Sequence, residues 1–290
     1  MTPSSTSRTV GDMAVGAVAF GAASLSLPDE RDDEAAVQTI RAAVDAGVRL
    51  IDTALAYTTV QDESHSEALV RKALQGSALR EEVLVATKGG HFRAGPASFP
   101  FDGRPETLHR HCEISLRTLG VERIDLYHLH HPDPQVPFAE SVGALRELRD
   151  AGKIARVGIS NVDVDQLEAA RAIVDIASVQ NHFSLYDDTD RPVLDRCTAL
   201  GIAYLAYSPL KGSKKDVLAG VATEIGRRHG VSAAQVVLRW NLRQSDRLIC
   251  IVGATRQRTI LDSLRAPQLA LTDDEAAELT AGARMSRSDP

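Results

Sequence analysis

Short apolar runs alternate with longer amphipathic stretches along almost the whole chain of 290 residues. The runs are rich in valine, isoleucine and leucine, and some are apolar at every position, such as Val-Leu-Val-Ala at residues 83–86. Continuous runs of this kind are typical of parallel strands that are buried on both faces. The pattern predicts eight strands, at residues 15–20, 48–51, 83–86, 124–129, 154–159, 176–179, 202–207 and 248–252.

The stretches between these strands have the spacing of helices that bury one face. In residues 34–46, Val37, Ile40 and Val44 fall on one side of the helix, and Gly47 ends the pattern. Residues 105–119 begin with a proline, which suits the first helical position, and are followed by a glycine. A further helix is predicted at residues 138–151, and capping boxes at residues 232–235 and 272–275.

Eight alternating strands and helices predict a single (β/α)8 TIM barrel, an α/β fold that takes about 250 residues. We expect one domain over residues 1–290, with the polar residues 1–8 as a frayed tail. A doubly wound sheet is the alternative fold. It would normally show a G-x-G-x-x-G turn after its first strand, and residues 15–22 lack that spacing.

Composition and charge exclude several classes of protein. Hydrophobic residues make up 43% of the chain and charged residues 25%, as in an ordinary globular protein. The net charge is −6 and no basic stripe occurs, so nucleic acid and anionic membranes are not expected partners. No apolar run reaches the roughly 18 residues of a membrane span, and the N-terminus lacks a signal peptide. Three scattered cysteines, Cys112, Cys197 and Cys250, fit a reducing cytoplasm.

The predicted strands are apolar, but each of the later seven runs into polar residues. In a barrel, function gathers at these carboxyl ends. Asp52 follows the second strand, Lys88 the third and His130 the fourth. The remaining strands lead into Ser160 and Asn161, Gln180 and Asn181, Tyr207 and Ser208, and residues 253–256.

Residues 47–57, Gly-Val-Arg-Leu-Ile-Asp-Thr-Ala-Leu-Ala-Tyr, resemble the Gly-x-x-x-x-Asp-Thr-Ala-x-x-Tyr signature of aldo-keto reductases. Later motifs of that family are matched in the same order. They lie at residues 85–88 (Val-Ala-Thr-Lys), 124–130 (Ile-Asp-Leu-Tyr-His-Leu-His), 158–161 (Gly-Ile-Ser-Asn), 179–181 (Val-Gln-Asn) and 207–210 (Tyr-Ser-Pro-Leu). The resemblance covers residues 8–285, and several motifs in order are far more specific than any one of them.

The resemblance implies a catalytic tetrad of Asp52, Tyr57, Lys88 and His130. It also implies an NADPH-dependent reductase that converts an aldehyde or ketone to an alcohol. The residue types suit this chemistry, because the alkoxide that forms on hydride transfer needs a proton. Tyr57 would be the general acid, and the Lys88 ammonium, paired with Asp52, would lower the pKa of the phenol. His130 would orient the carbonyl oxygen.

The same resemblance implies a site for NADP. Ser160, Asn161 and Gln180 would bind the carboxamide, and Tyr207 would stack on the nicotinamide ring. Ser208, Leu210, Gly212 and Ser213 would lie along the pyrophosphate, and Gly253, Thr255 and Arg256 beside the adenosine. Arg256 is the candidate for selecting the 2′-phosphate of NADP over NAD, since a guanidinium suits phosphate geometry.

Three features depart from the family pattern. The loop after Tyr57 is longer than the family's Tyr-Gly-x-Gly and lacks glycine. Asp262 and Ser263 replace the Glu-Asn pair that contacts adenine, and little chain follows the last predicted helix. The loop at residues 89–104 carries three phenylalanines and is expected to form an apolar pocket wall.

Two other functions remain open from the sequence. A cofactor-binding regulatory subunit, like the channel-associated β subunits of this fold, could keep the tetrad with little turnover. The N-terminus lacks an extra segment, which favours a free-standing enzyme. A metal-dependent hydrolase rests on His128 and His130, which alternation places on one face of a strand. Strands five, six and eight end in serine, glutamine and threonine rather than further ligands, so we expect no metal. The native carbonyl substrate and the oligomeric state stay open.

Overall fold

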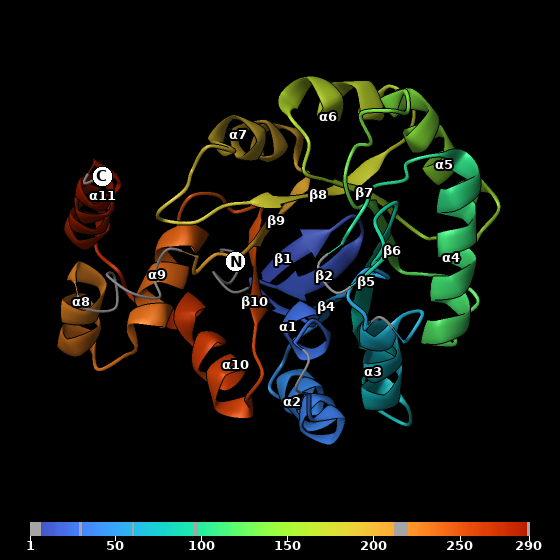
Figure 1. The fold of residues 1–290 in the computed structure, drawn as a ribbon. Coiled ribbons are helices and arrows are strands. Elements are labelled where there is room, and N and C mark those ends of the chain that lie inside the picture. Colours follow the sequence, from blue (N-terminus) through green and yellow to red (C-terminus); the bar gives the residue numbers. More distant parts are fainter. Residues whose placement is uncertain (1–6, 29–30, 60, 96–97, 212–219, 289–290) are drawn as a thin grey trace.

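Eight parallel strands close into a barrel at the centre of the computed structural model (Figure 1). The structure describes residues 7–28, 31–59, 61–95, 98–211 and 220–288. The barrel strands are β3 (Val18–Gly21), β4 (Leu50–Asp52), β5 (Leu84–Gly89), β6 (Leu126–Leu129), β7 (Val157–Ser160), β8 (Ile176–His182), β9 (Ala203–Tyr207) and β10 (Leu248–Gly253). β10 pairs with both β9 and β3, which closes the ring. The (β/α)8 prediction is confirmed, and the doubly wound alternative is wrong.

Helices surround the barrel and cover the outer face of the strands (Figure 1). They are α1 (Ala23–Ser26), α2 (Asp33–Asp45), α3 (His65–Leu74), α4 (Pro105–Leu119), α5 (Phe138–Asp150), α6 (Val164–Arg171), α7 (Arg191–Leu200), α8 (Val221–His229), α9 (Ala233–Leu242), α10 (Gln257–Ser263) and α11 (Asp273–Ser288), with 3-10 turns η1 (Arg80–Glu82) and η2 (Ala266–Gln268). Helices α8 and α11 lie farther out, with α8 packed against α9 and α11 against α8 (Figure 1). Helix α4 has the predicted bounds, because Pro105 opens it and Gly120 ends it in the left-handed conformation, at φ 69°. None of the helices in the described ranges is long and apolar enough to cross a membrane.

The two predicted capping boxes differ in the structure. At the start of α11, the Thr272 hydroxyl accepts from the Glu275 amide and the Glu275 carboxylate accepts from the Thr272 amide, which completes the box. At the start of α9, Ser232 caps the Gln235 amide, but the Gln235 side chain donates to Asp262 instead. The second box is therefore only half formed, because a tertiary contact takes its other partner.

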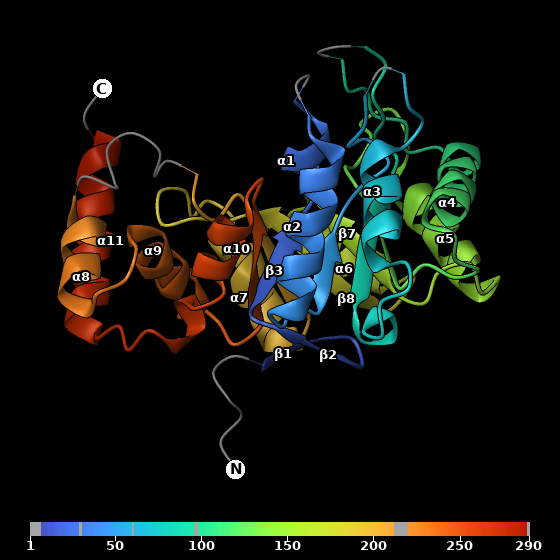
Figure 2. The same cartoon turned by 90° about the horizontal axis from the view of Figure 1, so that it is seen from below.

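An antiparallel hairpin precedes the barrel, formed by β1 (Ser7–Val10) and β2 (Met13–Gly16). Residues 1–8 were expected to be a frayed tail, and this is wrong for Ser7 and Arg8, which pair in β1. The predicted strand at residues 15–20 is also divided, since residue 15 belongs to the hairpin and the barrel strand begins at Val18. Figure 2 shows the hairpin at one end of the barrel.

The barrel interior is filled by side chains rather than open. Buried apolar residues from six of the strands pack there with Val10 and Val15 of the hairpin, which are 0% and 4% exposed. The hairpin thereby closes the amino-terminal end of the barrel. The opposite rim, where the strands end in polar residues, is the end at which barrels of this kind bind ligands.

Candidate active site

The four residues of the predicted tetrad come together at the carboxyl rim. Asp52 is the last residue of β4, Lys88 lies near the end of β5, and His130 directly follows β6. β4, β5 and β6 are consecutive neighbours in the barrel, so their ends adjoin. Tyr57 reaches the group from the loop that follows β4, in which its amide donates to the Ala54 carbonyl at 3.0 Å.

Lys88 and Asp52 form a buried ion pair. The Lys88 side chain is 0% exposed and Asp52 is 3% exposed. Lys88 Nζ lies 2.8 Å from both carboxylate oxygens and 2.8 Å from the Thr53 carbonyl oxygen. Burial lowers the pKa of Lys88, but the Asp52 carboxylate and Tyr57 raise it, and the balance lies above the ordinary value. The ammonium is therefore held charged at a fixed place.

The Tyr57 hydroxyl is the group on which this charge acts. It lies 3.3 Å from Lys88 Nζ, and the nitrogen lies 4.8 Å from the centre of the phenol ring. The sequence predicted that Lys88 would lower the pKa of Tyr57. Burial raises that pKa, Lys88 lowers it only in part, and the result is above the ordinary value. The phenol thus carries its proton throughout the neutral range.

His130 lies beside Tyr57, with the two ring centres 5.7 Å apart and the rings nearly perpendicular. The side chain is buried, and burial together with the Lys88 charge holds its pKa well below the usual value. A neutral imidazole has one N–H donor, which is what a carbonyl oxygen accepts. The pair of Tyr57 and His130 can therefore address one oxygen atom from two sides.

The residues predicted to hold the carboxamide lie across the barrel from β4. The Gln180 amide nitrogen donates to Asp52 at 2.7 Å, so it is tied directly to the tetrad. Ser160 donates to the Gln180 carbonyl oxygen at 2.6 Å. Asn161 adopts a left-handed backbone, at φ 59°, and its amide donates to the His130 carbonyl oxygen at 2.9 Å. Its own oxygen accepts from the Tyr207 hydroxyl at 2.8 Å.

A cavity of about 520 Å³ opens beside the tetrad and is lined by several of the predicted cofactor residues. Its walls include Asp52 and Tyr57 on one side, and Tyr207, Ser208, Leu210 and Gly253 on another, and these four are predicted cofactor contacts. Gly212 and Ser213, predicted along the pyrophosphate, lie outside the described residues, as do Lys214 and Lys215. The cavity is of the size that takes a small-molecule ligand.

Thr255 and Arg256 follow Gly253 in the chain, are exposed, and are not among the residues that line this cavity. Arg256 is the residue before the first turn of α10. Asp262, which takes a position that the family uses for adenine, is already engaged. Its carboxylate accepts from Ser232 at 2.5 Å and from Gln235 at 2.6 Å, which ties α10 to the start of α9. Ser263 is buried and donates to the Thr259 carbonyl oxygen.

The loop at residues 89–104 brings aromatic side chains to the rim, but not all of those expected. Phe99 and Phe101 gather around His91, with ring centres 5.8 and 5.1 Å away. Phe101 also lies 4.8 Å from the His131 ring and is 44% exposed. Phe92 turns instead toward His111 in α4. Phe99 and Phe101 therefore form an aromatic cluster with His91 and His131, but the residues that line the cavity beside Tyr57 include none of the three phenylalanines, so the predicted pocket wall is not part of that cavity.

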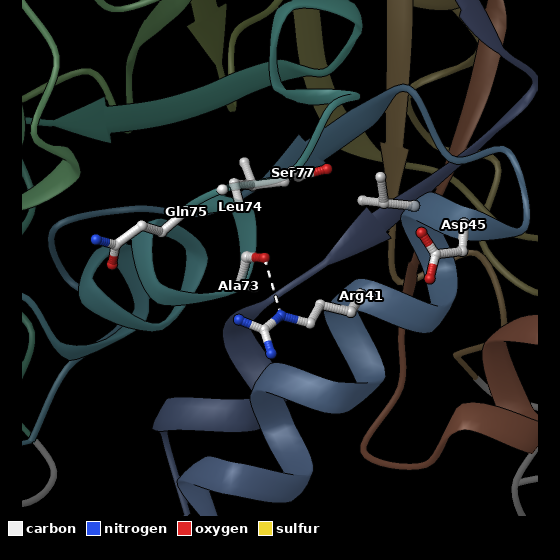
Figure 3. A pocket seen from close by; sticks show the side chains of 8 residues that line it. Arg41, Asp45, Ala73, Leu74, Gln75 and Ser77 are labelled. Carbon is white, nitrogen blue, oxygen red and sulfur yellow. Dashed lines mark hydrogen bonds between the residues drawn. The ribbon is translucent and has the colours of Figure 1, made fainter.

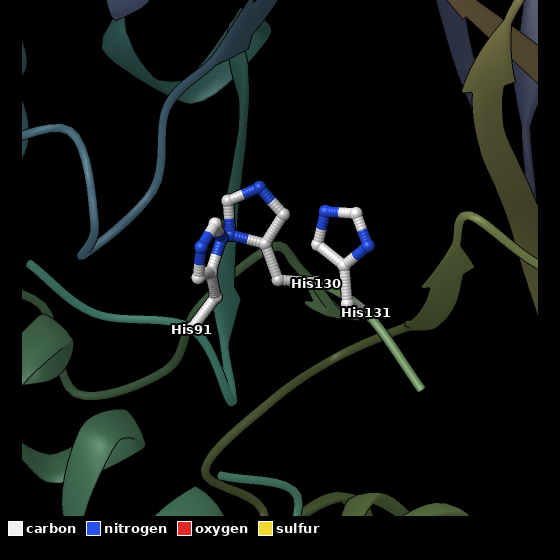
Figure 4. A group of neighbouring side chains, drawn as sticks. All are labelled: His91, His130 and His131. Atoms are coloured by element: carbon white, nitrogen blue, oxygen red, sulfur yellow. The ribbon is translucent and has the colours of Figure 1, made fainter. Parts of the chain in front are cut away.

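His128, one of the two histidines that suggested a metal site, has a hydrogen-bond partner of its own. His128 is fully buried and its Nε2 lies 2.9 Å from the Ser178 hydroxyl. Among the described residues, the three histidines close enough to share an ion are His91, His130 and His131 (Figure 4). His91 was not predicted from the sequence, although it follows β5 within three residues of Lys88, the same signal that identified the other site residues.

A smaller cavity of about 250 Å³ lies far from this site, between α2 and α3 (Figure 3). Arg41 donates there to the Ala73 and Lys72 carbonyl oxygens, both at 3.1 Å. These carbonyls belong to the last turn of α3, which lies at the amino-terminal end of the barrel. The contact satisfies helix-end acceptors and explains the arginine without a ligand.

The chain is similar to known proteins along most of its length. The model of the "Aldo/keto reductase family" matches residues 12–283. The chain belongs to the aldo/keto reductase family. An uncharacterized oxidoreductase of Schizosaccharomyces pombe is 31% identical to this aldo/keto reductase over 274 residues, covering 93% of this chain and 87% of the relative.

Solved structures of the same family have the same barrel. An aldo/keto reductase from Klebsiella pneumoniae, in complex with NADP and acetate, superposes with a TM-score of 0.81 at 27% identity, over 96% of this chain and 95% of the other. Another structure from that organism, in complex with NADPH, has a TM-score of 0.78 at 28% identity, over 93% and 92% of the two chains. All four tetrad positions of this aldo/keto reductase fall inside the matched segment.

Proposed function

We propose that this aldo/keto reductase is an NADPH-dependent enzyme that reduces an aldehyde or ketone to an alcohol. One observation carries the proposal. The Tyr57 hydroxyl lies 3.3 Å from an ammonium that a buried carboxylate holds at 2.8 Å, on the wall of a cavity large enough for a ligand. In this arrangement the Tyr57 phenol can donate its proton to a ligand in the cavity, because the Lys88 ammonium stabilises the tyrosinate that is left.

The cofactor fits the residues that surround the cavity. NADP and NADPH are bound by the family members of known structure described above, and we propose the same cofactor here. Asn161 and Gln180 offer amide groups at the rim, and the half-buried Tyr207 offers a flat ring on the cavity wall. NADPH, when bound, supplies the hydride that reduces the carbonyl carbon.

The chain's own residues supply the proton and the orientation. As the carbonyl carbon gains hydride, its oxygen gains negative charge and accepts the Tyr57 proton, and the O–H bond of the phenol breaks. The tyrosinate that remains is stabilised by Lys88 at 3.3 Å, whose charge Asp52 balances. His130 donates to the same oxygen and fixes its position. No residue of the tetrad needs a metal ion for this step.

Two further properties belong to the proposal. We infer a cytoplasmic location, which the three buried free cysteines support, since thiols persist in a reducing compartment. The partner is a small carbonyl compound. Phe99 and Phe101 lie against His91, whose ring is beside that of His130, and this apolar cluster near the tetrad favours a substrate with an apolar side.

The pH dependence of reduction follows from the two pKa directions. The pKa of Tyr57 is raised above 10, so the phenol stays protonated up to at least that pH. The pKa of His130 is held well below 6.5, so the imidazole stays neutral down to mildly acidic pH. We expect kcat/KM for the carbonyl to be flat between about pH 6 and 9. A profile that bends near 6.5 would show that His130 titrates in the neutral range and would contradict the neutral-donor role.

Arg256 is expected to decide between NADPH and NADH. A guanidinium holds a phosphate through charge-assisted hydrogen bonds worth roughly 1.5–3 kcal/mol, or about ten- to a hundredfold in affinity. Arg256→Ala should weaken NADPH binding by that factor and leave NADH binding nearly unchanged, as measured by fluorescence titration. Arg258→Ala, an exposed arginine two residues on, is the matched control. Equal weakening of both cofactors by Arg256→Ala would remove the residue from phosphate recognition.

A further inference from the structure

Three histidine side chains converge at the rim of the barrel, next to the tetrad residue Tyr57. His91 comes from the loop after β5, and His130 and His131 follow β6 (Figure 4). One ring nitrogen from each lies within 4.8 Å of the other two. The ring centres of His91 lie 4.7 Å from His130 and 5.2 Å from His131.

Two of these rings have a free nitrogen that is buried. Nδ1 of His91 and Nδ1 of His130 have no hydrogen-bond partner among the described residues, and neither is accessible to solvent. His130 as a whole is only 6% exposed. A buried polar atom without a partner in a native structure calls for an explanation, and an ion is one of the ordinary explanations.

The hydrogen bond on the other side of His91 favours the ion. Its Nε2 lies 2.8 Å from the Phe99 carbonyl oxygen, which can only accept, so Nε2 carries the proton and Nδ1 has the lone pair. Histidines that bind metal usually donate their second nitrogen to a backbone carbonyl or carboxylate in this way. The loop at residues 89–104 therefore presents His91 in the tautomer that binds a cation.

His131 completes the group at some cost. The Asn161 amide donates to its Nε2 at 3.1 Å, so an ion must compete with Asn161 for that lone pair. Two ligand nitrogens on one tetrahedral zinc ion lie about 3.4 Å apart, given Zn–N bonds of about 2.0–2.1 Å. The nitrogens here, within 4.8 Å of one another, reach that spacing by small rotations of the rings.

We propose that His91, His130 and His131 form a binding site for one Zn²⁺ or similar divalent transition-metal ion, which inhibits the enzyme by engaging His130. Three imidazoles favour zinc, cobalt or nickel over Mg²⁺ and Ca²⁺, which prefer oxygen ligands. The ion leaves a coordination position for water, because the group supplies three ligands. The rotation that brings His130 Nδ1 to the ion also turns the N–H of the same ring away from the place where it donates to the carbonyl oxygen, and this is the cause of inhibition. Inhibition therefore rests on the function proposed above, whereas binding of the ion does not.

Calorimetry on the full chain, stripped with EDTA, tests the site directly. Wild type is expected to bind one equivalent of Zn²⁺, and Mg²⁺ should give no binding. His91→Gln should weaken zinc binding at least about tenfold, the usual effect of losing a group from a metal site. His91→Phe keeps an aromatic ring against Phe99 and Phe101 but removes the ligand nitrogen. It should therefore weaken zinc binding as much as His91→Gln does. His109→Gln changes a histidine of α4 whose side chain is 42% exposed, and should have no effect.

Turnover gives the second readout. Zinc should inhibit wild type with the midpoint found by calorimetry, and EDTA should restore the activity. In His91→Gln the ratio of rates with and without zinc should move toward one. The site would be overturned if zinc binding is not stoichiometric. It would also be overturned if wild type and both His91 variants bind zinc equally well. Inhibition that persists unchanged in those variants would overturn the inhibitory role. Stoichiometric binding that depends on His91 in a chain without reductase activity would support the metal site and contradict the proposed function.

Discussion

Replacing Tyr57 with phenylalanine is expected to lower kcat for carbonyl reduction by roughly 10²- to 10⁴-fold, the usual contribution of a general acid. The substitution removes only the hydroxyl that lies 3.3 Å from Lys88 Nζ and leaves the ring beside His130. The affinity for NADPH should hardly change, because the hydroxyl acts on the carbonyl. Steady-state kinetics at saturating NADPH, with a fluorescence titration of the cofactor, measure the two quantities separately.

Tyr127→Phe is the matched control for this experiment. Tyr127 lies in β6 and is fully buried, and its hydroxyl has no hydrogen-bond partner among the described residues. Removing a hydroxyl that makes no bond should leave both kcat and stability close to wild type. If Tyr57→Phe keeps full turnover while the protein is folded and binds NADPH, then Tyr57 is not the proton donor.

Breaking the buried ion pair should have the largest effect on stability. Lys88→Met leaves the Asp52 carboxylate buried with Gln180 as its remaining side-chain partner, and Asp52→Leu leaves the Lys88 ammonium without its counter-charge. Loss of one partner from a buried pair costs about 3–5 kcal/mol. We expect each single variant to lose about that much free energy of unfolding, measured by urea denaturation.

The double variant shows whether the stability lost in each single variant comes from leaving one charge buried without its partner. With both charges gone, no unpaired ion is left in the core, and pairs replaced together by apolar residues are often neutral. Asp52→Leu with Lys88→Met should therefore be more stable than either single variant, although inactive. Lys72→Met, which breaks an exposed pair with Glu34, should cost less than about 1 kcal/mol. Additive losses in the double variant would show that the two residues do not act as a pair.

The sequence was sufficient for the barrel because its signals are local and repeated. A strand buried on both faces reads as a continuous apolar run, and a helix that ends at a left-handed glycine, such as Gly120, has a marked end. The hairpin was missed because Val10 and Val15 pack against the bottom of the barrel, a contact that no local pattern records. The run at residues 15–20 looks like one strand, although the chain leaves the hairpin within it.

The tetrad was predictable from residue positions at strand ends together with the family motifs. The direction in which the pKa of Tyr57 is shifted was not predictable. The sequence places a cation near Tyr57, but how strongly burial opposes that cation depends on the packing of the whole rim. His91 shows the same limit. Its place near the end of β5 is visible in the sequence, but its approach to His130 depends on the fold of the loop that follows.

Transfer of deuterium from labelled NADPH is the most direct test of carbonyl reduction by this protein. The protein is incubated with NADPH carrying deuterium at C4 of the nicotinamide, on one face or the other, and with a set of aldehydes and ketones. One of the two labels is expected to appear at the carbinol carbon of an alcohol product, at a rate that Tyr57→Phe lowers by roughly 10²-fold or more. Tight binding of NADPH with no label in any product would contradict carbonyl reduction, and would instead indicate a cofactor-binding regulatory protein.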